Sequence, residues 1–502
     1  MVSLYHLAQR LMYFPEGHPA KRRRTCLNWR YWEYEEGNTE KGDHPCLGQD
    51  IELIEGVQKR NFKRMPYMSA TDKLISFTQE LDCARVSDLL FQQARRCVLD
   101  LLGAAIAGSR TLMAQLSAQF AFGQFNTGDA TVVGFSRKLS PSGATWVNGA
   151  SASALDLDDG HRPAMGHPGA SVIPAALSVA ETVNASGEDL LTAIVAGYEV
   201  AVRASISRTP TFKKGFYCTG IWGAFGAVTA AAKLLRLDAS SFQHAIGITL
   251  AHAPFPGGGG MAKEGIGWAG MVGCAAAFLA QQGFEGAKDA FDRPGRYDTD
   301  QLVEGLGQEY AILKTYFKPH ASCRWSHPAI DGVLELVSRH RLKPQEIESV
   351  WVEAFYEATR LDRPVPDTAI AAQFSIPFCI ALALLYGRVG LAEMTEANLH
   401  NPEVLRLARK VKITINPEYD RQFPEKTVSK VTLYTSSGSF TTTVEFPKGN
   451  PENPLSDAEL LEKFRALSTD VITQDQIAAL EEAVDRLTHL PNVRELTRLL
   501  TV

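Results

Sequence analysis

The chain has 502 residues, of which 45% are hydrophobic, and a formal net charge of −5 at pH 7. A chain of this length divides into two or three domains, and this much apolar material is enough for sizeable cores. The mild negative charge creates no general field that would gather nucleic acid or an anionic membrane, so we expect neither partner. An anionic substrate must therefore be met by a few locally placed cations.

The eight cysteines are scattered along the chain, with no CxxC pair and no clustered spacing of the kind that zinc or iron–sulfur sites use. They indicate reduced intracellular thiols and hence a cytoplasmic protein. The pattern offers no local signature for a zinc or iron–sulfur site, and we expect a protein that uses no metal and no other cofactor.

Residues 1–67 differ in composition from the rest of the chain. They are rich in charged and aromatic residues but show no helical or strand periodicity, which predicts a poorly ordered N-terminal extension. The basic run Lys21–Arg24 is short, so a solvated tail is favoured over a targeting patch, although an organellar address in this extension stays open.

Residues 68–317 show the patterns of an all-helical domain. Apolar side chains repeat at helical spacing along one stripe that ends at Gly108: Leu90, Ala94, Cys97, Leu101 and Ala104. Further Ala-rich helices are predicted over 171–184, 187–206, 220–236, 239–252 and 266–282. The charge-free stretch Gly265–Phe284 is long enough to span a bilayer but is only weakly hydrophobic, so we expect a buried central helix there.

Residues 318–454 change character. Four stretches alternate apolar and polar residues as half-buried strands do: Ile347–Phe355, Lys410–Asn416, Lys430–Thr435 and Ser439–Glu445. The turn between the last two predicts a hairpin, and the whole region predicts an α+β lid domain with helices on one face of a sheet. Residues 455–502 return to amphipathic helices that we expect to pack back on the helical domain.

The densest polar cluster is DLDDGHRPAMGHPGAS, Asp156–Ser171, between two apolar helical segments. Its carboxylates, imidazoles and arginine are the groups needed to position a general base and hold its tautomer. Asp and His are also natural ligands of divalent metals. A third alternative is structural, with the aspartates capping a helix, and the residues alone leave these three open.

A second cluster, GGGGMAKEGIGW, covers Gly257–Trp268. The phosphate-loop spacing is not met, so nucleotide binding is disfavoured. Lys263 stands at the head of a very apolar helix, where a partly desolvated ammonium group can bind a carboxylate or exchange a proton, although an ordinary exposed lysine is the alternative.

The third cluster, KPHASCRWSHPAID, covers Lys318–Asp331 at the join between the two domains. Lys318, His320 and Arg324 offer donors for several substrate carboxylates, and sites often lie between domains. Cys323 and His320 could form a nucleophilic pair, but a buried structural thiol is the more common arrangement.

These three clusters, in this order, resemble the MmgE/PrpD family, which includes 2-methylcitrate dehydratases, cis-aconitate decarboxylases and related epimerases. The resemblance rests on five segments and covers about residue 70 to the C-terminus: WVNGASASALDLDDGHRPAMGHPGASVIPAAL, GYEVAVR, KKGFYCTGIWGAFGAVTAAAKLLRL, MAKEGIGWAGMVG and KPHASCRWSHPAID. It implies a large helical domain, a smaller α+β lid, a homodimer and a site at the domain junction.

Carried over by residue, the resemblance implies that Asp156, His167 and Lys263 are catalytic. The chain departs from the decarboxylase pattern at two positions, with Tyr217 where a histidine is expected and His320 where a tyrosine is expected. The two groups look exchanged, so we add both to the catalytic set. We expect the substrate carboxylates to be bound by four further side chains: His161, Arg162, Lys318 and Arg324.

The chemistry expected of this set is proton removal next to a carboxylate, with His167 as base, Asp156 orienting it and Lys263 stabilising the developing charge. His320 or Tyr217 would protonate a departing hydroxide. The first hypothesis is therefore dehydration of 2-methylcitrate or an alkylcitrate. Decarboxylation of a cis-aconitate-like acid is second, epimerisation of a dicarboxylate third, and an inactive binding protein is the alternative from a different class.

Overall fold

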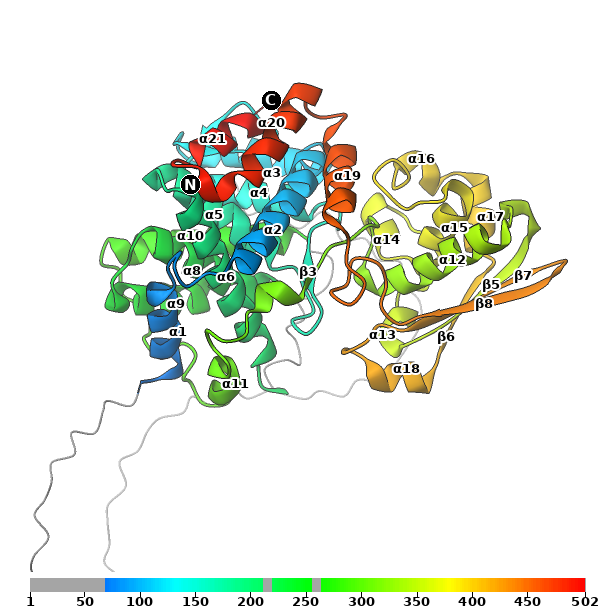
Figure 1. Cartoon of the computed structure of the whole chain (residues 1–502), viewed down its shortest axis with the longest axis horizontal. Helices are drawn as coiled ribbons and strands as arrows, with labels where there is room; N and C mark the ends of the chain where they lie inside the picture. Colours follow the sequence, from blue (N-terminus) through cyan, green and yellow to red (C-terminus); the bar gives the residue numbers. More distant parts are fainter. Residues whose placement is uncertain (1–67, 211–218, 255–262, 502) are drawn as a thin grey trace, which may run out of the picture. The chain divides into compact units, whose positions relative to one another are not determined.

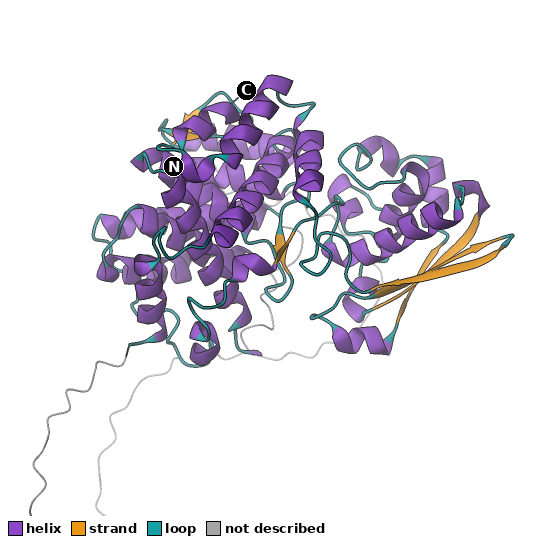
Figure 2. Ribbon diagram, in the orientation of Figure 1, coloured by secondary structure: helices purple, strands orange, loops and turns teal. Residues whose placement is uncertain are grey.

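A computed structural model describes residues 68–210, 219–254 and 263–501 (Figure 1). The predicted extension over 1–67 lies outside these residues, and so does Tyr217. Within the described part the chain is mainly helical with small sheets, which confirms the predicted fold class (Figure 2).

The first part of the described chain is built from helices: α1 (Ala70–Glu80), α2 (Asp88–Gly108), α3 (Leu112–Gln124), α4 (Pro141–Ser153), α5 (Gly169–Val183), α6 (Gly187–Ile206), α8 (Thr219–Leu234), α9 (Ala239–His252), α10 (Glu264–Gln281) and α11 (Thr299–Val303). Serine hydroxyls cap several of them, as Ser87 does by accepting from the Leu90 amide. The helices expected from apolar periodicity are confirmed, because caps and stripes are local signals.

Small residues let these helices pack closely. The helix α10 packs against α4, α5, α8 and α9, and α6 packs against α8. At the α6–α8 contact, a Cβ added to Gly226 would lie 2.7 Å from the Ala201 Cβ, so a larger residue cannot fit there. Among the described residues no single helix is long and apolar enough to cross a membrane, although α2 and α3 pass such a test as a pair bent by 87°.

The lid contains a four-stranded sheet in the order β6-β5-β7-β8. Its strands are β5 (Ile347–Ala354), β6 (Val411–Ile415), β7 (Ser429–Thr435) and β8 (Gly438–Val444), with β5 and β6 parallel and the other pairs antiparallel. The predicted hairpin is confirmed as β7–β8. Helix α12 (His327–His340) packs on β7 and β8, and α15 (Ile376–Tyr386) packs on α12 (Figure 1). Short helices connect these elements: α13 (Tyr356–Thr359), α14 (Ala369–Gln373), α16 (Glu396–Leu399), α17 (Pro402–Ala408) and α18 (Pro417–Gln422).

The C-terminal helices return to the helical part, where α19 (Asp457–Ser468) and α20 (Gln474–Asp485) pack against α2 and the short α21 (Arg494–Thr497) against α5. A small ribbon, β3 (Gly160–His161) paired with β4 (Thr315–Tyr316), ties the first polar cluster to the start of the lid. A second ribbon pairs β1 (Ala130–Thr131) with β2 (Lys138–Leu139). The β3–β4 ribbon therefore brings the first and third sequence clusters together.

Candidate active site

The loop between α4 and α5 carries most of the polar groups. It turns at Asp156, whose φ of 53° lies in the left-handed region that non-glycine residues seldom adopt. It then enters β3 at Gly160, where an added Cβ would lie 2.3 Å from the Tyr316 hydroxyl oxygen, so only glycine allows this ribbon to close. The sharp turn and the close pairing place the Asp156 carboxylate inside the protein.

Asp156 is 1% exposed and binds two ammonium groups through the same oxygen. Its Oδ1 accepts from Lys263 Nζ and, at 2.5 Å, from Lys318 Nζ, which also donates to the Asp156 carbonyl oxygen at 2.9 Å. Burial alone would raise the pKa of Asp156, but the two lysines outweigh it and hold the pKa well below its ordinary value. With both ammonium groups protonated, these three residues carry one net positive charge, and the buried carboxylate of Asp158, whose pKa is also lowered, lies within 4.8 Å of Asp156.

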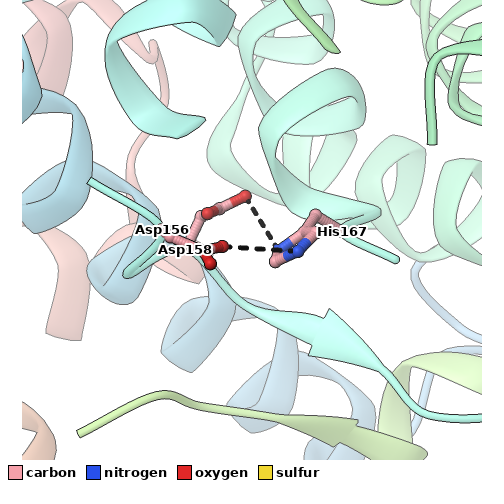
Figure 3. Close-up of side chains that lie close together, drawn as sticks. All are labelled: Asp156, Asp158 and His167. Carbon is pink, nitrogen blue, oxygen red and sulfur yellow. Dashed lines mark ion pairs between the residues drawn. The ribbon is translucent and has the colours of Figure 1, made fainter. Parts of the chain in front are cut away.

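The imidazole of His167 lies beside the carboxylates of Asp156 and Asp158 (Figure 3). Its Nδ1 is 2.9 Å from the carbonyl oxygen of Asp159 and 3.2 Å from Asp158 Oδ2, while its Nε2 is 3.6 Å from Asp156 Oδ1. A carbonyl oxygen only accepts, so Nδ1 carries the hydrogen and points it at Asp159. In the neutral ring Nε2 is then free to take a proton, and in the charged ring it can deliver one.

From the sequence Asp156 was expected to orient His167, and the structure adds the neighbouring residues Asp158 and Asp159. Asp158 is fully buried, and neither of its oxygens accepts a hydrogen bond within the described residues. Asp159 accepts from the Tyr198 hydroxyl at 2.5 Å and from the Gly169 amide at 3.0 Å, and burial raises its pKa to about 7. These contacts hold Asp159 in place, and its backbone oxygen accepts the hydrogen bond from His167 Nδ1.

A pocket of about 200 Å³ opens beside these groups. The predicted site residues that line it are Asp156, Arg162, His167, Lys263 and Arg324. Thr219 from α8 and Ile266 from α10 also line it, and the lid contributes Cys323, Trp325, Phe374 and Phe423. The helical part and the lid thus share the pocket, and its lining combines charged and aromatic side chains.

Two arginines hold positive charge at the pocket. Arg162 forms an ion pair with Glu452 at 2.7 Å. Arg324 instead donates to neutral acceptors, the backbone oxygens of Pro447 at 3.1 Å and Lys448 at 3.0 Å, and its buried Nε has no partner within the described residues. Burial lowers the pKa of Arg324 to about 10, which still leaves the guanidinium charged at neutral pH.

Three predicted site residues are not among the described residues that line the pocket. His161 is buried, accepts from the Ala164 amide at 3.3 Å and has its pKa lowered by burial to about 3, so it is neutral. Lys318 contacts Asp156 and has no exposed surface. His320 pairs with Asp331 at 2.8 Å.

Cys323, for which the sequence left a nucleophilic or a structural role open, lines the pocket. Burial raises its pKa to about 11, which keeps the sulfur protonated and weakly nucleophilic at neutral pH. The aromatic lining was not singled out from the sequence, because its members come from separate segments of the lid and carry no polar signal.

Asp156, Asp158 and His167 offer ligand atoms within 4.8 Å of one another, which is close enough to hold a metal ion. The Oδ1 atom of Asp156, however, already accepts from Lys263 and Lys318. A divalent cation bound here would lie next to two ammonium groups and would be repelled by both. The site is therefore better suited to an anion than to a metal ion.

A larger hollow of about 820 Å³ lies elsewhere on the helical part, lined by residues from α1, α6, α8 and the segments next to them. Its lysine, Lys233, donates to the backbone oxygens of Thr78 at 2.7 Å and Leu81 at 2.5 Å. Lys233 therefore binds backbone oxygens at the end of α1. The pocket of about 200 Å³ is the one where Asp156, His167 and Lys263 converge.

Comparisons with known proteins match both parts of the chain. Residues 72–299 match the family model of the MmgE/PrpD N-terminal domain, and residues 320–489 match that of the MmgE/PrpD C-terminal domain. A cis-aconitate decarboxylase of Aspergillus terreus (strain NIH 2624 / FGSC A1156) is 28% identical over 451 residues, which cover 82% of this chain and 92% of the relative.

Two mammalian relatives carry the same name. The cis-aconitate decarboxylase of Homo sapiens is 27% identical over 468 residues, covering 87% of this chain and 95% of the relative. That of Mus musculus is 26% identical over 462 residues, covering 87% and 94%. The similarity therefore extends over both the helical part and the lid.

Proposed function

This chain belongs to the MmgE/PrpD family, and from that premise we propose that it is a lyase that removes CO₂ from cis-aconitate or a closely similar polycarboxylic acid. The observation that carries the proposal is the pocket, where Lys263, Arg324 and the imidazole of His167 meet in one small volume. The names of the relatives support the choice of reaction.

The substrate class follows from charge. Arg324 is 7% exposed, and within the described residues it bonds to carbonyl and amide oxygens and to His327 but forms no ion pair. A buried cation that lacks a carboxylate partner and lines a pocket is suited to bind the carboxylate of a ligand. Lys263, whose ammonium group also lines the pocket, offers a second carboxylate site.

The chemistry requires one proton transfer. When CO₂ leaves, the electron pair of the broken carbon–carbon bond stays on the substrate, delocalised over the alkene and a carboxylate, and a proton must be added to give the unsaturated dicarboxylate. The imidazolium of His167 can deliver that proton from Nε2, since Nδ1 is held by the Asp159 carbonyl. Lys263 would stabilise the negative charge before the proton arrives.

Dehydration, the first hypothesis from the sequence, is less well supported than decarboxylation. It needs a second group to protonate the departing hydroxide, and His320, one candidate, bonds to Asp331 and is not among the described residues that line the pocket. Tyr217, the other candidate, lies outside the described residues. The relatives are also named decarboxylases rather than dehydratases.

The proposal is tested with the purified protein and four acids: cis-aconitate, citrate, 2-methylcitrate and an alkylcitrate. We expect CO₂ release from cis-aconitate, with a change in ultraviolet absorbance in step as its alkene becomes that of the unsaturated dicarboxylate. Alkene formation from 2-methylcitrate without CO₂ would instead restore dehydration, and no turnover of any acid would favour the epimerase or binding-protein alternatives.

We further propose that the protein forms the homodimer that the family resemblance implies. Leu112, Leu116 and Phe120 are 74%, 55% and 51% exposed and share one face of α3 at helical spacing. Trp268 and Leu279 on α10 are also exposed. Sedimentation should give a dimer for the wild type and a monomer for Leu116→Glu; a monomeric wild type would contradict the proposal.

A further inference from the structure

Lys263 and Lys318 share Asp156 but occupy different places. Lys263 lines the pocket, whereas Lys318 has no exposed surface and is not among the described lining residues. Lys318 holds Asp156 at two atoms, the carboxylate Oδ1 at 2.5 Å and the backbone oxygen at 2.9 Å. The second contact fixes the backbone exactly where Asp156 adopts its left-handed conformation.

This arrangement decides what happens when Lys263 engages a substrate. If Lys263 were the only partner of Asp156, a shift of its ammonium group towards a substrate carboxylate would leave a buried carboxylate without a counter-charge, which is strongly unfavourable. The Lys263–Asp156 pair alone would also be neutral and would attract no anion. With Lys318 present, the Asp156 carboxylate keeps a counter-charge when the ammonium group of Lys263 shifts towards the substrate.

We propose that Lys318 is a positioning residue, a permanent counter-ion that keeps Asp156 ionised and in place so that Lys263 is free to bind the substrate carboxylate. This inference rests on the proposed function, because it assumes a polycarboxylate ligand. It differs from the expectation drawn from the sequence, which made Lys318 a substrate-binding residue.

The proposal predicts that affinity follows the net charge of the three residues. Lys318→Met reduces that charge from one to zero, and the Asp156→Asn/Lys318→Met double variant returns it to one. We expect Lys318→Met to weaken the binding of tricarballylate, a saturated tricarboxylate that cannot lose CO₂ by this route, about tenfold. The double variant should bind within about threefold of the wild type.

The measurement is isothermal titration of the full-length protein with tricarballylate. Lys314→Met is the matched control, since this lysine is 62% exposed, lies four residues before Lys318 and pairs with Glu309 at the surface. It should bind as the wild type does. Circular dichroism establishes that each variant is folded.

Two results would overturn the inference: binding by folded Lys318→Met within about threefold of the wild type, or a double variant weaker than that limit. If Lys318→Met does not fold, the double variant alone decides, because it removes both buried charges together. Wild-type CO₂ release from cis-aconitate is measured in parallel. Tricarballylate binding without CO₂ release would refute the proposed reaction and leave the role of Lys318 intact.

Discussion

Two buried carboxylates, Glu181 and Asp156, are each 1% exposed but have very different surroundings. Glu181, on α5, accepts from the Thr131 amide at 2.7 Å, the Thr131 hydroxyl at 2.8 Å and Lys138 Nζ at 2.6 Å. Lys138 is itself 37% exposed, so its charge is partly solvated. These three donors to the Glu181 carboxylate all come from the β1–β2 ribbon, which the carboxylate holds against α5.

Asp156 instead pairs with two lysines, and one of them, Lys263, lines a pocket. Its neighbour Asp158 is buried without a hydrogen-bond partner in the described residues. A carboxylate whose donors match its own charge stabilises a fold, whereas surplus charge and unsatisfied atoms are costly for folding and mark a functional site.

The largest effect is expected for His167→Ala. Without the imidazole the proton donor at Nε2 is lost, so kcat should fall by roughly two to four orders of magnitude with little change in KM. Initial rates of CO₂ release measure both constants. His244→Ala is the control, because that imidazole bonds to the Gly286 backbone oxygen away from the pocket. Equal rates for His167→Ala and the wild type would remove His167 from the mechanism.

Lys263→Ala should change both kinetic constants. The ammonium group both binds a substrate carboxylate and stabilises the carbanion, so we expect KM to rise and kcat to fall, each about tenfold or more. The fold should persist because Lys318 still neutralises Asp156. Lys233→Ala, which removes a lysine bound only to backbone oxygens in the described residues, should leave both constants unchanged. A normal KM for Lys263→Ala would contradict its binding role.

Glu181→Ala should show the opposite pattern. It leaves the Thr131 amide and hydroxyl buried without an acceptor, so we expect a loss of about 2–4 kcal/mol in the free energy of unfolding. Turnover per folded molecule should stay normal. Urea unfolding measures the loss, with Glu482→Ala as an exposed control on α20. If Glu181→Ala were as stable as the control, the structural role assigned to this carboxylate would be wrong.

A smaller effect concerns Asp159, whose pKa burial raises from 3.8 to about 7. Because the folded state holds this proton more tightly than the unfolded state, Asp159 makes the protein less stable as the pH rises from about 4 to 7. Asp159→Asn cannot ionise, so its Tm should fall less than that of the wild type between pH 5 and pH 8. If thermal melts showed the same fall in Tm for both proteins between pH 5 and pH 8, the raised pKa of Asp159 would be contradicted.

No effect is expected from exhaustive treatment with EDTA. The two ammonium groups on Asp156 supply the positive charge that a metal would otherwise provide. CO₂ release should therefore be the same before and after dialysis against the chelator. If activity were lost and one divalent ion restored it, Asp156, Asp158 and His167 would be identified as ligands of a metal ion.

Much of the fold was predictable because its signals are local. The helices α6 and α9 follow from apolar periodicity and from a serine and an aspartate cap, signals that act within a few residues. The β7–β8 hairpin follows from alternation around a short turn. The loop that holds Asp156 and His167 was recognisable for the same reason, since its polar residues are neighbours in sequence.

By itself the sequence therefore determined the helical part, the lid and the loop where the reactive groups gather. Only the tertiary structure decided their partners. Lys263 and Lys318 reach Asp156 from 107 and 162 residues away, and His320 faces Asp331 rather than the pocket. The environment of a buried charge is set by side chains from distant segments, and no local pattern records which of them will meet.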